Sequence, residues 1–410
     1  MAEKVKKNEQ SEMSHVNRYT MTVDINGYKY NHGYGTRMEY TELSDYWNNS
    51  YPVRVLKIQI PFTDVQGIVH SEKKNVNNRP MYDINIMVKP LDKDGFQNKP
   101  FVDGAFKGIM KDGDYTNDVN QEFKPDSRML TRELGEVEVE MVFYLYKEEE
   151  LKYSQGEINL VMNNPTLSQA WLSGFSMSNP GMKAICSKFE HNPPMGMLVI
   201  PPSGYPDFMQ FLDDEAGFFN TPYMDFIEHG VYFLLNRDND VKCKNAKLEY
   251  MITFTVGRNP EKPVDKYIRK LDEMNYEMSV SAADLNITVS NNKSFGQSIK
   301  FIPPSGQGQR SDRGLSRNYD VVFKTTEVPH IQMLENPVYE NIEINLNNNC
   351  VNFVTPLTKF SIMDSVGKPR IYRVSGKQTT IVAGQYSTTK IKGFRLIKDA
   401  APAGGQQAPK

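Results

Sequence analysis

Apolar and polar residues alternate along the first third of the chain, and this alternation predicts β-strands with one buried and one solvated face. The alternating segments are Tyr19–Ile25, Val53–Ile60, Tyr82–Val88 and Leu134–Tyr146. Asn26-Gly27 follows the first segment and predicts a tight hairpin turn. We therefore expect an antiparallel β domain over residues 17–148. The polar residues 1–16 before it predict a flexible arm.

One part of this first domain lacks the pattern. Residues 91–126 are rich in Gly, Asp, Asn and Lys, and we expect them to form a long, mostly irregular loop. Loops of this length in compact domains are usually functional or mobile.

Helical spacing replaces alternation in the middle of the chain. Leu167, Ala170 and Trp171 lie three and four positions apart on a predicted short helix. Met182, Ile185 and Phe189 form a similar stripe, which predicts a second helix over residues 181–189. We therefore expect an α/β domain over residues 149–240.

The stretch Gly196–Arg237 predicts a strand, a helix and two further strands. Met197–Ile200 is an apolar run that fits a buried strand, and Pro201-Pro202 are expected to end it because proline donates no hydrogen bond to a sheet. Ser203 is the predicted N-cap of the helix, and Gly217 the predicted stop. The apolar face of this helix contains Phe208, Phe211, Leu212 and Ala216.

The other face of this helix is acidic, and we expect Asp213-Asp214-Glu215 to point to solvent. Beyond the helix, Asp225–Ile227 and Val231–Leu235 predict two strands joined by a turn at Glu228-His229-Gly230.

Strand patterns return in the last third of the chain. The segments are Ala246–Val256, Leu285–Val289, Tyr319–Phe323, Ile342–Leu346 and Ile371–Val374. Pro263–Met274 has apolar residues at helical spacing and predicts a helix, whereas residues 306–317 predict a polar, basic loop. We expect a second β domain over residues 241–398 and a disordered tail over residues 399–410.

The middle of the chain carries a family resemblance. From Pro165 to Arg237, Pro-Pro-Ser precedes a helix with the sequence FLDDEAGFF, and MDF and VYFLLNR follow. This arrangement resembles the central region of phage baseplate hub proteins, the trimeric adaptors between tail tube and spike that are related to the front part of VgrG. The resemblance implies a β-dominated α+β fold in which two tail-tube-like antiparallel β-barrel domains flank a small α/β insertion.

The resemblance also implies a structural function. Three copies of such a hub form a pseudo-hexameric ring that connects the hexameric tube to the trimeric central spike and lines the DNA channel. The implied partners are a tail tube or tube-initiator protein, the spike protein and other baseplate proteins of a contractile tail. Such a protein is found in the virion and is assembled in the cytoplasm of the bacterial host.

Composition and charge narrow the possible partners. A chain of 410 residues predicts two or three domains, and its net charge of -2 excludes a global basic field for nucleic acid. Viral DNA is therefore expected to pass without specific binding. Cys186, Cys243 and Cys350 lie far apart, which argues against a disulfide framework or a zinc site. No apolar run reaches the ~18 residues of a membrane span, so we expect no membrane insertion.

Catalytic motifs are represented only by near matches, and we expect no enzymatic activity. Gly174–Ser178 resembles a nucleophile elbow but lacks its closing glycine and a preceding strand. The carboxylates at 213–215 are adjacent on a helix and therefore diverge. Arg310, Arg313 and Arg317 lie near glycines but lack the Lys-Ser/Thr of a phosphate-binding loop. We predict no catalytic, cofactor-binding or metal-binding residues and no cofactor.

The histidines also lack the spacing of a metal site. They are His15, His32, His70, His191, His229 and His330. His229 lies beside Glu228, but a hairpin tip accounts for the polarity of both residues.

Two other functions are compatible with β domains in such a particle. One is a cell-wall-degrading enzyme, which requires a productive carboxylate pair and an aromatic cleft, although the chain contains only two tryptophans, Trp47 and Trp171. The other is a neck or capsid connector. Release of sugars from host walls would identify the enzyme, and a twelve-copy ring would identify the neck connector.

Overall fold

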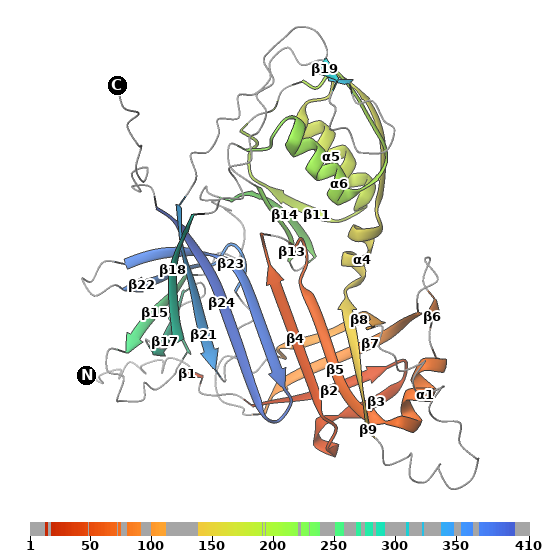
Figure 1. The fold of residues 1–410 in the computed structure, drawn as a ribbon, viewed down its shortest axis with the longest axis vertical. Helices are drawn as coiled ribbons and strands as arrows, with labels where there is room; N and C mark the ends of the chain where they lie inside the picture. The colour runs from red at the N-terminus through yellow and green to blue at the C-terminus, as the bar shows by residue number, and fades with distance from the viewer. Residues whose placement is uncertain are drawn as a thin grey trace, which may run out of the picture.

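The computed structural model describes about two thirds of the chain in separate stretches. These are residues 13–14, 18–47, 49–71, 73–74, 80–91, 100–111, 138–190, 192, 194–219, 223–228, 230–237, 251–257, 268–271, 275–281, 284–291, 309–310, 322–323, 338–347, 354–363 and 369–397. Strands dominate them, which confirms the prediction of a β-dominated fold. Figure 1 shows two groups of strands side by side below a smaller group that contains α5 and α6.

The first β unit is an antiparallel sheet in the order β3-β2-β7-β8-β9-β5-β4. Its strands are β2 (Tyr19–Ile25), β3 (Tyr28–Asn31), β4 (Met38–Asp45), β5 (Val53–Pro61), β7 (Pro80–Pro90), β8 (Val102–Met110) and β9 (Glu138–Tyr146). It also carries η1 (His32–Tyr34), α1 (Phe62–His70) and β6 (Lys73–Lys74). Asn26 and Gly27 have φ of 50° and 96°, so the predicted hairpin turn is confirmed.

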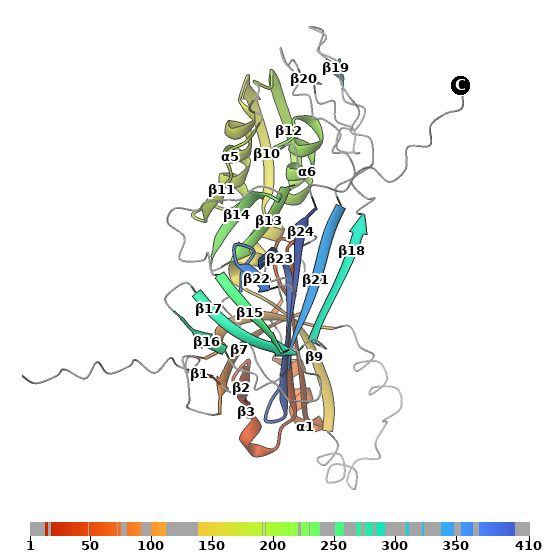
Figure 2. The same cartoon turned by 90° about the vertical axis from the view of Figure 1, so that its left-hand side faces the viewer.

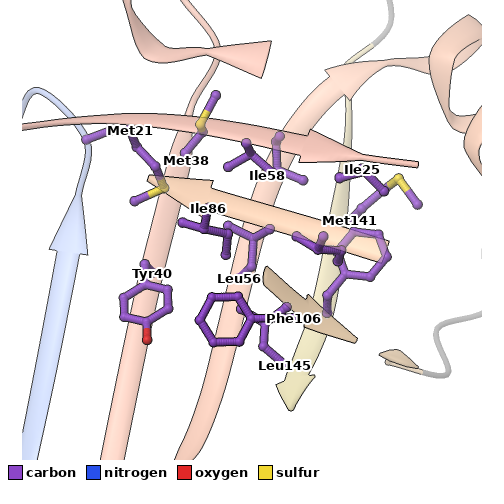
Figure 3. Close-up of a cluster of buried hydrophobic side chains, with 14 of the residues drawn as sticks. Met21, Ile25, Met38, Tyr40, Leu56, Ile58, Ile86, Phe106, Met141 and Leu145 are labelled. Atoms are coloured by element: carbon purple, nitrogen blue, oxygen red, sulfur yellow. The ribbon is translucent and has the colours of Figure 1, made fainter. Parts of the chain in front are cut away.

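Alternate residues of these strands fill one core, as the sequence pattern predicts. Figure 3 shows side chains from several strands of the unit converging, including Met21, Ile58, Ile86 and Met141. All four are at most 1% exposed. Burial of this apolar face stabilises the sheet by roughly 25 cal/mol for each Å² removed from water.

The second β unit has the strand order β16-β17-β15-β22-β23-β24-β21-β18. Its strands are β15 (Met251–Gly257), β16 (Ile268–Lys270), β17 (Asn275–Ser281), β18 (Leu285–Asn291), β21 (Val338–Asn347), β22 (Lys359–Met363), β23 (Pro369–Val382) and β24 (Tyr386–Leu396). The short β1 (Met13–Ser14) pairs with β16, so two residues of the predicted flexible arm lie in the sheet.

The α/β unit lies between these sheets in sequence. Its elements are α4 (Glu148–Gln155), β10 (Glu157–Asn163), α5 (Leu167–Ser178), β11 (Lys183–Cys186), β12 (Met197–Gly204), α6 (Tyr205–Glu215), β13 (Tyr223–Glu228) and β14 (Val231–Asn236). Strands β10 and β12 pair with each other, and β14 lies between β11 and β13. Two further short strands, β19 (Gln309–Arg310) and β20 (Val322–Phe323), pair near β12 (Figure 2).

The cores of the three units share elements at their borders. Phe233 and Leu235 of β14 pack into the core of the second β unit, whereas Tyr232 and Leu234 pack into the core of the α/β unit. At the other end of the chain, Ile381 of β23 belongs to the core of the first β unit. The chain therefore crosses between the units rather than completing one before it begins the next.

The predicted irregular loop over residues 91–126 is wrong where the structure describes it. Residues 102–110 form β8, which pairs with both β7 and β9. Two of its residues on the core side are glycines, Gly104 and Gly108, and these hide the apolar alternation. At Gly108 an added Cβ would overlap the end of the Ile84 side chain, so the Ile84 side chain of β7 packs directly over the backbone of β8 there.

Two predicted helices are also corrected. Within residues 181–189, Lys183–Cys186 is strand β11, parallel to β14. Ile185 packs toward the core of the second β unit and Cys186 toward that of the α/β unit, so both faces are apolar and no period-two signal remains. Within Pro263–Met274, Ile268–Lys270 is strand β16, which pairs with β17.

The Pro-Pro segment is corrected as well. Strand β12 continues through Pro201 and Pro202 to Gly204. The register of β10 and β12 shifts at this point, and a β-bulge is one of the few sheet positions that accept proline. Gly204, rather than Ser203, is the N-cap of α6, and it makes no side-chain capping bond.

The remaining predictions of this region have mixed outcomes. The apolar face of α6 and the stop at Gly217, with φ of 69°, are confirmed. Asp213 does not point freely to solvent, because its Oδ1 accepts a 3.2 Å hydrogen bond from the Phe218 N–H. The predicted tail over residues 399–410, and all of the 306–317 loop except β19, lie outside the described residues.

Candidate assembly surfaces and the contacts that position them

A buried ion cluster lies where β4, β5, α4 and β23 meet. The Arg54 side chain is 5% exposed, and its Nη1 lies 2.8 Å from both carboxylate oxygens of Glu150. Its Nε donates to Glu42 Oε2 at 3.1 Å. Glu42 also accepts from the Tyr40 hydroxyl at 2.8 Å, and Lys377 Nζ lies 3.8 Å from Glu42 Oε1. These contacts connect all three units.

The charges in this cluster stabilise one another. Burial alone raises the pKa of the Glu42 carboxyl, but Arg54 and Lys377 outweigh burial and bring it down to about 2. Burial lowers the pKa of Arg54, and the two carboxylates Glu42 and Glu150 more than reverse that shift. Glu42 and Arg54 are therefore held in their charged forms, and removal of one partner leaves the other as an uncompensated buried charge.

A second cluster surrounds the buried carboxylate of Asp225 on β13. Its Oδ2 accepts hydrogen bonds from Ser50 at 2.9 Å and from Tyr153 and Tyr232 at 3.0 Å each. Burial raises the pKa of Asp225, although the three hydroxyl donors oppose the shift. The Ile227 N–H also donates to the Ser50 carbonyl at 2.7 Å. These bonds fix the α/β unit to the segment between β4 and β5.

A third contact secures the C-terminal end of the α/β unit. The Arg237 guanidinium carbon lies 4.6 Å from the centre of the Trp47 ring and 5.4 Å from that of Tyr339. Its Nη2 donates to the Tyr339 hydroxyl at 2.9 Å. The Trp47 ring also contacts Phe394 edge to face, with ring centres 4.9 Å apart. Trp47 thus joins the segment after β4 to β21 and β24 of the second β unit.

The two β units share a five-strand connectivity. The antiparallel pairs are β4–β5, β5–β9, β9–β8 and β8–β7 in the first unit and β18–β21, β21–β24, β24–β23 and β23–β22 in the second. The five strands follow one another in the same chain order in both units. The correspondence ends at the next strand, since β2 is antiparallel to β7 whereas β15 is parallel to β22.

The hairpin of β23 and β24 joins the two sheets. The first part of β23 pairs with β22, and its second part, Gly376–Val382, pairs with β4 of the first unit. At the hairpin tip, the Gly384 N–H donates to the Tyr19 carbonyl at 2.8 Å. Gly384 has φ of 70°, and an added Cβ would overlap the His32 ring. The tip therefore fits closely against β2 and η1.

Strand β18 forms an open edge of the second sheet. All of its seven residues pair with β21, and among the described residues no strand pairs with its other side. Ile287 lies opposite Ile342 and therefore shares its face of the sheet. Ile342 is 2% exposed but Ile287 is 45% exposed. Leu285 of β18 packs against the core of the second unit, but the core ends before it covers Ile287.

The outer face of β3, β2, β7 and β8 is hollowed, with a volume of 620 Å³. Tyr34, which is 90% exposed, stands at its rim, and Asp24, Lys29, Asn85 and Asp103 line it. Apolar residues, including Val23, Ile86 and Ala105, line the hollow together with these charged and amide side chains.

Among the residues that the structure describes, the candidate chemical residues are not brought together at one site. Gly174–Ser178 lies within α5, so the strand–turn–helix of a nucleophile elbow is absent from this described segment. The described residues include no cluster of ligands suited to a metal ion. Cys186 is a free thiol whose pKa burial raises to about 12. Cys243, Cys350, His229 and the arginines 313 and 317 lie outside the described residues.

In the described part of the chain, every helix is too short or too polar to span a membrane.

Sequence reasoning missed the residues that position the sheets. Arg54 occupies an inward-facing position of β5 between hydrophobic neighbours, and a charge in such a position is a signal that a buried partner exists. Its partner Glu150 is distant in sequence, and no local pattern identifies it.

Comparison with known proteins gives matches only at the level of structure. No protein-family model and no curated protein sequence matches the chain. The tail protein from Neisseria meningitidis MC58 matches with a TM-score of 0.44 and 12% identity, over 92% of this chain and 97% of that one. The 43 kDa tail protein of prophage MuSo2 from Shewanella oneidensis matches with a TM-score of 0.42 and 9% identity, over 91% and 97% of the two chains.

A third match is the E. coli c3393 protein, which is described as a component of the type VI secretion system with structural similarity to the T4 bacteriophage tail proteins gp27 and gp5. Its TM-score is 0.37 at 8% identity, over 94% of this chain and 75% of that one. These matched structures are described as tail proteins and as a component of the type VI secretion system.

Proposed function

We propose that the chain is a structural hub of a contractile-tail baseplate. Three copies form a ring of six β units, which connects the hexameric tail tube to the trimeric central spike and surrounds the path of the DNA. The observation that carries this proposal is the repeated five-strand connectivity, because one chain then contributes two similar units to the ring.

Symmetry explains why such a repeat is useful. A six-fold tube and a three-fold spike have no common interface unless each adaptor subunit presents two similar surfaces to the tube. The sequence resemblance over Pro165–Arg237 supports the same function, since it concerns the insertion that distinguishes a hub from a simple tube subunit.

The same proposal divides the chain into domains. The first barrel covers residues 17–148, completed by the tip of the β23–β24 hairpin, whose hydrogen bond to Tyr19 brings β23 back to β2. The α/β insertion covers residues 149–240, and the second barrel residues 241–398. The three hydrophobic cores support this division.

The proposed role is non-enzymatic, in the virion. A net charge of -2 supports a channel along which DNA slides, because phosphate binding requires a basic surface. Retention of duplex DNA by the purified protein at low salt would contradict this part of the proposal.

Stoichiometry tests the function as a whole. Native mass spectrometry of the purified protein, alone and with candidate tube and spike proteins, is expected to show three copies in each complex. A twelve-copy assembly would identify a neck ring instead. A chain that remains monomeric with both partners present would also refute the hub.

A further inference from the structure

We propose that the open edge of β18 is the surface on which a second copy of this chain docks, through the free end of its β8–β9 pair. This inference rests on the proposed function, because it names the strands that join one copy to the next in the ring.

Strand β18 has the features of an edge that pairs with another chain. Residues 285–291 form a regular strand with one described neighbour, and Ile287 on its apolar side is 45% exposed. An open edge with exposed apolar residues is a template for pairing with another chain, and monomeric proteins usually protect such edges with charges, prolines or bulges. The sequence of β18, LNITVSN, contains none of the charged residues or prolines.

The chain already contains one contact of the proposed kind, the pairing of β23 with β4. By connectivity, β4 of the first unit corresponds to β18 of the second, since each begins the five-strand series. The edge of β4 is covered by the second part of β23, in register from Gly376–Asp45 to Val382–Glu39. The edge of β18 is the corresponding edge of the second unit, and among the described residues no strand pairs with it.

The strand that would pair with β18 is found by the same correspondence. Strand β23 corresponds to β8 in the first unit, because each is the middle strand of the three-strand meander. The pairing of β8 with β7 ends at Gly108, whereas Ile109 and Met110 continue beside β9 alone. Among the described residues, no strand pairs with the other side of Ile109 and Met110. Each chain therefore has one strand end, Ile109–Met110 of β8, and one strand edge, that of β18, without a described pairing partner.

These two strands do not meet within one molecule. Figure 1 shows β8 in the first β unit and β18 in the second, well apart from each other. The contact between copies therefore joins two different surfaces, β8 of one copy and β18 of the next. Such a head-to-tail contact closes into a ring when the rotation that relates one copy to the next divides a full turn. Contacts within and between copies alternate around such a ring, so three copies present six similar junctions.

The test is the same substitution at two isoleucines of similar exposure. Ile287 on β18 is 45% exposed, and Ile371 on β23 is 49% exposed in a strand that pairs with β22. Ile287→Lys places a charge in the proposed contact and is expected to lower the association constant of the copies at least about tenfold. Ile371→Lys is expected to leave it unchanged. Analytical ultracentrifugation measures both, and thermal unfolding checks that each variant is folded.

Cross-linking gives an independent measurement. A chain with Ile109→Cys and a second chain with Thr288→Cys, both with the three natural cysteines replaced by serine, are mixed and treated with a bismaleimide. A covalent dimer is expected only in the mixture. If the wild type is trimeric but Ile287→Lys associates normally and no mixed dimer forms, the β18 contact is overturned while the hub remains. If the wild type with its tube and spike partners does not form trimers, both are overturned.

Discussion

Replacement of Arg54 by methionine tests the contacts that hold the three units together. Methionine keeps the unbranched stem of the side chain and its packing near the Phe106 ring, which lies 5.8 Å from the Arg54 guanidinium carbon. The change removes only the charge and its hydrogen bonds. Glu150 and Glu42, which are 2% and 17% exposed, then remain in the interior without their main counter-charge.

Two estimates give the size of the effect. Removing one partner of a buried ion pair destabilises a protein by roughly 3–5 kcal/mol, because the other charge stays buried without compensation. The pKa of Glu42 falls from 4.5 to about 2 on folding, which corresponds to roughly 3 kcal/mol for its charged form. We therefore expect Arg54→Met to lower the free energy of unfolding by about 3–5 kcal/mol near neutral pH.

The pH dependence follows from the direction of the shift. A carboxylate whose pKa is lowered on folding contributes stability above its unfolded pKa, and that stability is lost as pH falls from about 4.5 toward 2. In Arg54→Met this contribution is missing at neutral pH. The difference between variant and wild type is therefore expected to shrink as the carboxylates take up protons in acid.

Urea unfolding followed by tryptophan fluorescence measures this difference, with Lys57→Met as the matched control. Lys57 lies on the same strand and pairs with Glu39 at 3.0 Å, but its side chain is 42% exposed. An exposed pair of this kind contributes about 0–1 kcal/mol. If Arg54→Met destabilises the protein no more than Lys57→Met, the buried cluster does not hold the units together and the reasoning is refuted.

Three further substitutions test other parts of the structure. Gly384→Ala is expected to destabilise the protein more than Gly230→Ala in thermal unfolding, because both have φ near 70° but only the first meets a neighbour, the His32 ring. Equal effects would contradict the fit of the hairpin tip. Gly174→Ala is expected to lower the melting temperature, since its Cβ would overlap the Phe208 ring between α5 and α6; an unchanged temperature would contradict that close approach. Burial raises the pKa of Asp213 from 3.8 to about 6, so wild-type stability is lost as pH rises through this range. Asp213→Asn is therefore expected to gain up to about 3 kcal/mol relative to wild type between about pH 4 and pH 7 in urea unfolding, and a constant difference would contradict the shift.

The sequence pattern predicts strands well where one face is buried and the other is wet. Tyr82, Ile84, Ile86 and Val88 of β7 are examples, because each lies at most 1% exposed in one core. The pattern fails where a strand is buried on both faces. Strand β14 is buried on both faces, yet its length still indicates a strand, whereas the shorter β11 has the spacing of a helix.

Strand β24 shows a different failure, since no sequence pattern indicated it. Its buried side includes Ser387 and Thr389, both 0% exposed, so polar residues interrupt the apolar alternation on that side. The Thr389 hydroxyl lies 3.3 Å from the Thr379 hydroxyl on β23. This hydrogen bond gives the hydroxyls of Thr379 and Thr389 a partner inside the sheet.

The candidate assembly surface was only half predictable. The alternation of Leu285, Ile287 and Val289 correctly indicates a strand. That β18 lies at an edge, and that it corresponds to β4, depends on pairings such as β21–β24 and β5–β9 between segments far apart in sequence. Strand order of this kind is a property of the whole fold and leaves no local signal.

A cryo-electron-microscopy reconstruction of the assembled particle, viewed along the ring axis, tests the central claim most directly. The account predicts three copies of the 47.0 kDa chain arranged as six similar β units, alternating between the first and second unit. A ring with only one β unit per copy at the channel, or with a copy number that is not three, would contradict it.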